Sequence, residues 1–240
     1  MKTTIGSFKL LLKNKNIFFT TIALDALFFV SLLSIKVISD YFAKSLFFTA
    51  DILSFIVYLT LTLLYYISVI LVYSYFSMQV FKKINFMFKK TEGRKFIELF
   101  SMNMVTVSIL SLIYIFLAYF VSGLKENISK TASLAAFSVF ILIFYVMLSS
   151  SQTVFWKGSS IKKTIKSSFN ALVSKKYSVI ILQSFLILAF TALLVNFAYI
   201  LLELEQNSSQ SWILELFFLA LSYVLFSANR ISFYEAAMEQ

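Results

Sequence analysis

The stretch WKGSSIKKTIKSSFNALVSKKY, residues 156–177, decides the fold class. It is too charged to cross a membrane, yet its apolar residues recur at the spacing of one helical face. These apolar residues are Ile161, Ile165, Phe169, Leu172 and Val173. The pattern is typical of a helix that lies flat on an anionic membrane surface and leads directly into a spanning helix. We expect its apolar face to anchor the hairpin that follows, and Trp156 and Tyr177 to be interfacial aromatics.

The composition indicates a polytopic membrane protein. The 240 residues are 60% hydrophobic and only 13% charged, well outside the usage of globular proteins. The chain has no Cys and no His, which excludes thiol nucleophiles, thiolate and His zinc sites, and His-dependent serine catalysis. It also lacks a phosphate-binding loop. We therefore predict a non-enzymatic protein with no cofactor, no metal and no catalytic residue.

Six apolar runs are long enough to cross about 30 Å of hydrocarbon as helices. They lie near residues 17–38, 52–78, 96–123, 132–155, 177–202 and 212–233. A lipid-exposed segment must satisfy its own backbone hydrogen bonds, so we expect helices rather than strands. The predicted fold is all-α: one transmembrane domain over residues 1–240, with six spanning helices arranged as three hairpins. Each hairpin would follow a basic amphipathic interfacial helix.

The basic residues give an orientation. Most of them fall at the N-terminus and in the second and fourth connections, which predicts that these parts and both termini are cytoplasmic. The +10 net charge thus fits phospholipid headgroups better than nucleic acid, because the lysines cluster in short loops between apolar runs. We expect the chain in the plasma membrane of a prokaryote. The lysines expected to face lipid headgroups are Lys9, Lys13, Lys82, Lys83, Lys162, Lys163, Lys166, Lys175 and Lys176.

The three basic segments show a spacing that suggests an internal repeat. Shifts of 80 and then 81 residues superimpose Phe8, Phe88 and Phe169 without gaps. The first and third copies agree best, since Ser7 recurs as Ser168. Repeat units would cover residues 1–80, 81–160 and 161–240. The alternative is that three hairpins of equal length produce the same spacing without common origin.

Several polar and charged residues fall within the expected spans. They are Asp25, Glu98, Asn103, Gln183, Asn196, Asn229 and Arg230. A carboxyl as deep as Asp25 needs a partner, a proton or a cation. Arg230 can pair with Asp25 or Glu98, or extend to the cytoplasmic surface. The amides are expected to form hydrogen bonds between helices.

The phrases GSSIKKTIKSSFNAL (158–172) and SFYEAA (232–237) resemble features of a loose group of uncharacterised prokaryotic six-helix membrane proteins. That group is similar to the membrane domain fused to some glycerophosphoryl diester phosphodiesterases. The resemblance implies six helices with interfacial helices and supplies no catalytic residue. A weaker similarity is to permease subunits of ABC-type exporters, which also begin with an amphipathic elbow helix.

Two functions follow as hypotheses. The first is a scaffold, assembly partner or lipid-organising element at the cytoplasmic leaflet, with anionic phospholipid and other membrane proteins as partners. The second is a transport component, either a permease subunit that works with a cytoplasmic ATPase or a small carrier that uses Asp25. Nucleic acid is not an expected partner, and the sequence leaves the oligomeric state open.

Overall fold

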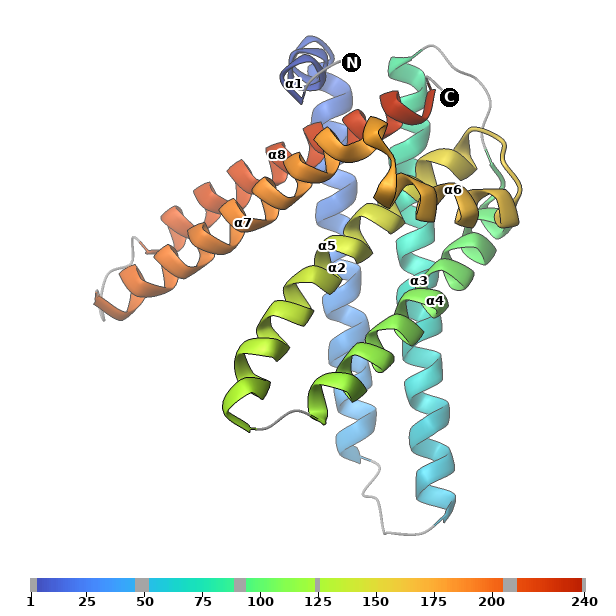
Figure 1. The fold of residues 1–240 in the computed structure, drawn as a ribbon, viewed down its shortest axis with the longest axis vertical. Coiled ribbons are helices and arrows are strands. Elements are labelled where there is room, and N and C mark those ends of the chain that lie inside the picture. Colours follow the sequence, from blue (N-terminus) through green and yellow to red (C-terminus); the bar gives the residue numbers. More distant parts are fainter. Residues whose placement is uncertain (1–3, 46–51, 89–93, 124–125, 205–210, 239–240) are drawn as a thin grey trace. The chain divides into compact units, whose positions relative to one another are not determined.

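The computed structural model describes residues 4–45, 52–88, 94–123, 126–204 and 211–238 (Figure 1). All regular structure in these residues is α-helical, and no strand occurs among them. The helices are α1 (Thr4–Lys13), α2 (Lys15–Ser45), α3 (Ile52–Met87), α4 (Phe96–Ser122), α5 (Glu126–Trp156), α6 (Ile161–Val173), α7 (Lys175–Leu204) and α8 (Ser211–Met238).

Five helices in the described residues are long and apolar enough to cross a membrane. These candidate spans are Lys15–Phe42, Ile52–Met87, Phe96–Ser122, Ala132–Trp156 and Tyr177–Leu194. Most of their apolar side chains remain exposed in the structure, an arrangement that hydrocarbon stabilises and water does not. They coincide with the first five predicted spans. The sixth span, 212–233, lies on α8, and its crossing of the membrane stays a prediction.

The helices form two compact units. One contains Asn14–Val107, and the other combines Met1–Lys13 with Ser108–Gln240. In the first of these, α2 packs on α3, where the ring of Phe28 lies 5.7 Å from that of Tyr73. The predicted single domain and its three repeat units stay predictions.

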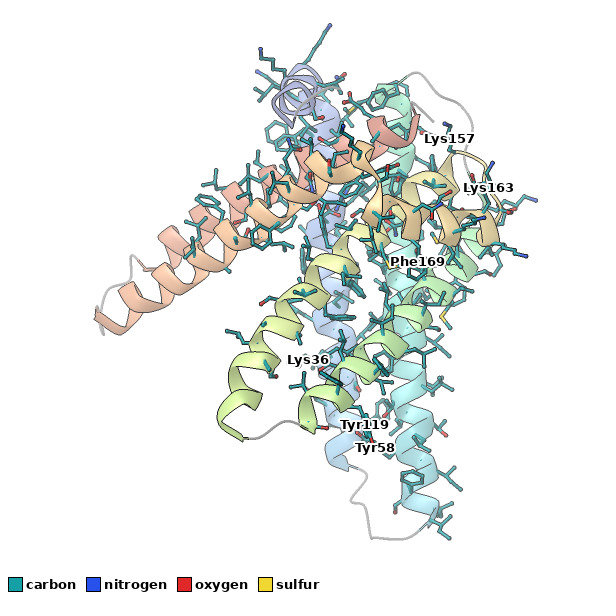
Figure 2. All side chains as sticks on the ribbon, in the orientation of Figure 1. Lys36, Tyr58, Tyr119, Lys157, Lys163 and Phe169 are labelled. Atoms are coloured by element: carbon teal, nitrogen blue, oxygen red, sulfur yellow. The ribbon has the colours of Figure 1, made fainter. Side chains whose placement is uncertain are left out.

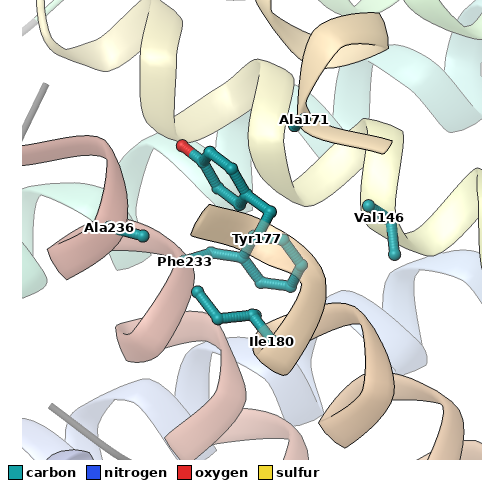
Figure 3. Packing of buried hydrophobic residues seen from close by; sticks show 6 residues of the cluster. All are labelled: Val146, Ala171, Tyr177, Ile180, Phe233 and Ala236. Atoms are coloured by element: carbon teal, nitrogen blue, oxygen red, sulfur yellow. The ribbon is translucent and has the colours of Figure 1, made fainter. Parts of the chain in front are cut away.

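The other unit joins the N-terminal helix to the C-terminal half of the chain. Helix α1 packs on α8, while α5, α6, α7 and α8 pack among themselves. Buried apolar side chains from these four helices meet in one cluster around Tyr177 and Phe233, whose rings stack at 6.3 Å (Figure 3). This cluster lies where α6 meets the bundle, since Ala171 of α6 and Val146 of α5 belong to it.

Local sequence explains why α6 is a separate helix. Helix α5 ends at Trp156, and Gly158 follows with a φ of 106°, a conformation that L side chains rarely adopt. Ser160 then caps α6, accepting a hydrogen bond from the Lys163 backbone N–H at 3.4 Å. At the other end Ser174 is extended, which separates α6 from α7.

The second basic segment behaves differently. In the part of residues 82–95 that the structure describes, no separate interfacial helix forms: Lys82 to Met87 continue α3, and Arg94 and Lys95 precede α4. The one residue of a capping type between Val80 and Met87 is Asn85, and it is buried within α3 rather than at a helix end. The prediction of an interfacial helix before each hairpin is therefore wrong for the described part of this segment.

Candidate functional site

The candidate site is the surface of α6 together with the lysines at its two ends. Helix α6 packs against α5 and α7 through a face of small residues. Thr164, Ser168 and Ala171 are buried there, and at 3.6 residues per turn they share one side of the helix. The Ser168 hydroxyl donates to the Thr164 carbonyl oxygen of its own helix at 2.9 Å. Close packing, rather than a hydrogen bond from Ser168, therefore seats this helix.

The bulky apolar residues of α6 lie on the next face around the helix. Ile161, Ile165 and Leu172 are half-buried, whereas Phe169 is 40% and Val173 is 87% exposed. Small residues make the closest contact with the bundle, Leu172 packs against its apolar cluster, and Phe169 and Val173 are exposed. The expectation that the apolar face anchors the hairpin stays a prediction.

The lysines lie on the exposed side of the helix. Lys162, Lys163 and Lys166 are exposed, and so are Lys157 at the end of α5 and Lys175 at the start of α7. Figure 2 shows Lys157 and Lys163 on one side of α6 and Phe169 on the other. The small residues thus form one face of α6, and the lysines lie around its exposed side, where Lys162 adjoins Phe169 and Val173.

Protein surrounds the two aromatic residues that flank this region. Trp156 is 3% exposed and Tyr177 is 1% exposed. Tyr177 stacks on Phe233 of α8 (Figure 3). The expectation that both would be interfacial aromatics among lipid headgroups is therefore wrong, because protein buries both side chains, and Tyr177 belongs to the cluster that includes Ala171 of α6.

The N-terminal helix is seated on α8 by hydrogen bonds. Ser7 is fully buried, and its hydroxyl lies 3.1 Å from the Ser232 hydroxyl. It also donates to the Glu235 carboxylate at 3.5 Å, which is a weak contact. Leu11, one turn further along α1, is buried on the same face. Lys9 and Lys13 are exposed.

Asn229 of α8 connects three helices. Its side-chain amide donates to the Ser184 hydroxyl of α7 at 2.8 Å and to the Tyr145 hydroxyl of α5 at 3.1 Å. The whole Asn229 side chain is buried. These bonds join α8, on which α1 packs, to α5, on which α6 packs.

The other predicted polar residues have separate places. In the unit 14–107, Asn103 donates to the Ser74 hydroxyl of α3 at 2.9 Å, and Glu98 pairs with Arg94 at 3.4 Å. Asp25 is 9% exposed on α2. In the other unit Gln183 and Arg230 are half-buried. The pairing of Arg230 with Asp25 or Glu98 stays a prediction.

The remaining predicted lysines that the structure describes are also at the surface. Lys82 and Lys83 are exposed on α3. The side chains of Asn196 and Lys176 lie outside the described residues. Among the described residues, no three acidic side chains gather as they would to hold a metal ion.

Sequence reasoning missed the serines that seat these helices. Ser7, Ser184 and Ser232 were not assigned partners because serine is common in membrane helices and each could bond to its own backbone. One signal was present in the sequence: Ser-Phe occurs at 7–8, 54–55, 168–169, 184–185 and 232–233. The serine is buried in four of these pairs and half-buried at Ser54.

Comparison of the chain with protein-family models, with curated proteins and with solved structures finds no match.

Proposed function

We propose that this chain is a non-enzymatic integral membrane protein that organises anionic phospholipid at the cytoplasmic leaflet, with α6 as its headgroup-binding element. In this proposal six helices span the plasma membrane of a prokaryote as three hairpins, and both termini are cytoplasmic. The buried small residues, the exposed apolar residues and the exposed lysines of α6 carry the proposal. A helix seated by small residues can expose its apolar face to acyl chains and its lysines to headgroup phosphates at the same time.

Charge supports the choice of ligand. A lysine near an anionic membrane surface contributes about 1 kcal/mol, and the attraction falls off within a Debye length of about 8 Å at physiological salt. Lys157, Lys162, Lys163, Lys166 and Lys175 are exposed within one short part of the chain. Together they favour a negatively charged lipid over a zwitterionic one.

The test measures phosphatidylglycerol bound to the purified protein by native mass spectrometry, with phosphatidylcholine as the competitor. The variant replaces Lys162, Lys163 and Lys166 by Gln. Losing three contributions of about 1 kcal/mol should weaken binding about 100-fold. The wild-type preference should also decrease as salt is raised.

The matched control replaces Lys36, Lys125 and Lys130 by Gln, because the predicted orientation places the connections after the first and third spans on the outer side. It should keep the affinity for phosphatidylglycerol. Equal losses in both triple variants would mean that only net charge matters, and would contradict a site on α6. No loss in either variant would contradict headgroup binding altogether.

Transport is the competing function, and the burial of Asp25 on the apolar helix α2 is the observation that favours it. Proteoliposomes containing the protein should show no solute or cation flux above that of empty liposomes. A flux abolished by Asp25→Asn would overturn the proposed lipid-organising function in favour of a carrier. A cytoplasmic ATPase that co-purifies with the wild type but not with the α6 variant would favour a permease subunit.

A further inference from the structure

A cleft of about 310 Å³ lies between α4 and α5, far along α5 from α6. This volume is at the small end of the range for ligand-binding pockets, which is about 300–1,000 Å³. The α4 wall includes Tyr114, Ala118 and Ser122, each four residues from the next. The α5 wall includes Ser133, Ala136 and Phe140. Each set recurs at the spacing of a single helix face, so the cleft lies along the facing stripes of two antiparallel helices.

The side chains give the cleft two different ends. At one end the rings of Tyr114 and Phe140 lie 5.1 Å apart and close it. Ala118 and Ala136 leave space in the middle because their side chains are short. At the other end Ser122 and Ser133 provide hydroxyl groups, close to where both candidate spans end. The cleft therefore has an apolar interior and a polar mouth.

Its length matches one leaflet of a bilayer. Tyr114 and Ser122 are eight residues apart, which is about 12 Å along a helix. Half of the hydrocarbon thickness is about 15 Å. A ligand in the cleft would therefore extend from the membrane interface toward the middle of the bilayer, and no further.

The size of the cleft selects among possible occupants. A helix about 10 Å wide and 12 Å long takes roughly 900 Å³, about three times the volume available. A hydrocarbon chain, whose carbons lie about 4 Å from their neighbours, takes roughly 200 Å³ over the same length. The cleft thus has room for one acyl chain, whereas a whole helix is too large to enter it.

We infer that the α4–α5 cleft binds one acyl chain of a membrane phospholipid, with its headgroup end at Ser122 and Ser133 and its chain end at Tyr114 and Phe140. The lipid belongs to the leaflet opposite the one that α6 meets in the proposed function. The site uses no lysine, so it is separate from headgroup binding at α6. Phospholipid is the source of the chain because both walls belong to candidate membrane spans, where lipid is the solvent.

The test uses two photoreactive phosphatidylcholines in proteoliposomes, one with a diazirine near the ester and one with a diazirine near the chain end. After irradiation, mass spectrometry maps the labelled residues. The first probe should label the part around Ser122 and Ser133, and the second the part around Tyr114 and Phe140. The same distribution of label for both probes would contradict a chain held in a fixed direction.

The cleft-filling variant is Ala136→Phe, and its matched control is Ala135→Phe, which adds the same ring at an exposed neighbouring position. Ala136→Phe should reduce labelling of the cleft at least tenfold, while Ala135→Phe should leave it unchanged. Equal labelling in both variants would mean ordinary lipid contact and would overturn the site. If Ala136→Phe does not fold, the positions labelled by the two probes in the wild type still decide.

Two further measurements test whether the acyl chain comes from a phospholipid and whether the cleft binds it independently of α6. Unlabelled phosphatidylcholine should compete with the probe, whereas competition by free fatty acid alone would contradict a phospholipid as the ligand. The variant with Gln at 162, 163 and 166 should keep full labelling of the cleft. Loss of labelling in that variant would contradict two independent sites.

Discussion

Helices α1 and α6 both pack on longer helices, but different contacts hold them there. Each is short, carries exposed lysines and buries one serine completely against a longer helix: Ser7 against α8 and Ser168 in the face that meets α5 and α7. In the predicted repeat the two serines occupy the same position. Ser232, the partner of Ser7, corresponds there to Ser151 of α5, which is also buried.

The two serines differ in their hydrogen bonds. Ser7 bonds across the interface to Ser232, whereas Ser168 bonds within its own helix. Helix α6 is joined to α5 by residues 157–160 and to α7 by Ser174 alone, and small side chains make its buried face. We infer that cross-helix bonds hold α1 and that a close fit holds α6.

The largest effect is expected from a variant that loosens the supports of both α1 and α6. Asn229→Leu keeps similar bulk but removes the bonds from α8 to Ser184 and Tyr145. Interhelical hydrogen bonds in membranes contribute about 0.6–1.7 kcal/mol each. The free energy of unfolding in a detergent–SDS titration should fall by about 2 to 3 kcal/mol. Asn170→Leu, at an exposed position of α6, is the control and should change it by less than about 0.5 kcal/mol.

An independent loosening of α6 is expected from Ser168→Leu. The added volume has no space in a fully buried seat, and overpacking typically costs about 1–3 kcal/mol. A single cysteine at Ala171, which is 2% exposed, should then react faster with a maleimide, and the chain has no other cysteine. Protection of that cysteine equal to the wild type would show that small residues do not seat α6.

A smaller effect is expected at α1. Ser7→Ala removes the bond to Ser232, which contributes about 1 kcal/mol. Amide hydrogen exchange in Thr4–Lys13 should become about fivefold faster, with exchange in α6 unchanged. Faster exchange in both helices would mean that α1 and α6 are not seated independently.

The smallest effect sharpens the comparison. Ser168→Ala removes a hydroxyl that donates to the Thr164 carbonyl oxygen of its own helix. Amide hydrogen exchange in Ile161–Val173 should therefore change less than twofold. This variant is the exact counterpart of Ser7→Ala in the predicted repeat. Equal increases in amide exchange in the two alanine variants would contradict the idea that a hydrogen bond holds α1 and close packing holds α6.

The sequence predicted the helices better than it predicted their faces. Long apolar runs located five candidate spans, and the helical spacing of apolar residues predicted α6. The buried face of α6 could not be predicted, because lipid accommodates Phe169 and Val173 as well as protein does, so hydrophobicity does not distinguish the two environments. The contact of Ser7 with Ser232 joins residues 225 positions apart, and one sequence contains no signal for such a pairing.

The unbroken course of α3 has a consequence for how this helix lies in the membrane. With 36 residues, α3 is about 54 Å long at 1.5 Å per residue, against a hydrocarbon thickness of about 30 Å. Transmembrane helices tilt by about 0–40°, and even at 40° this helix would cover about 41 Å along the bilayer normal. Lys82 and Lys83 mark the end of its apolar part, so the last turns of α3 would extend beyond the hydrocarbon and place these lysines among the headgroups.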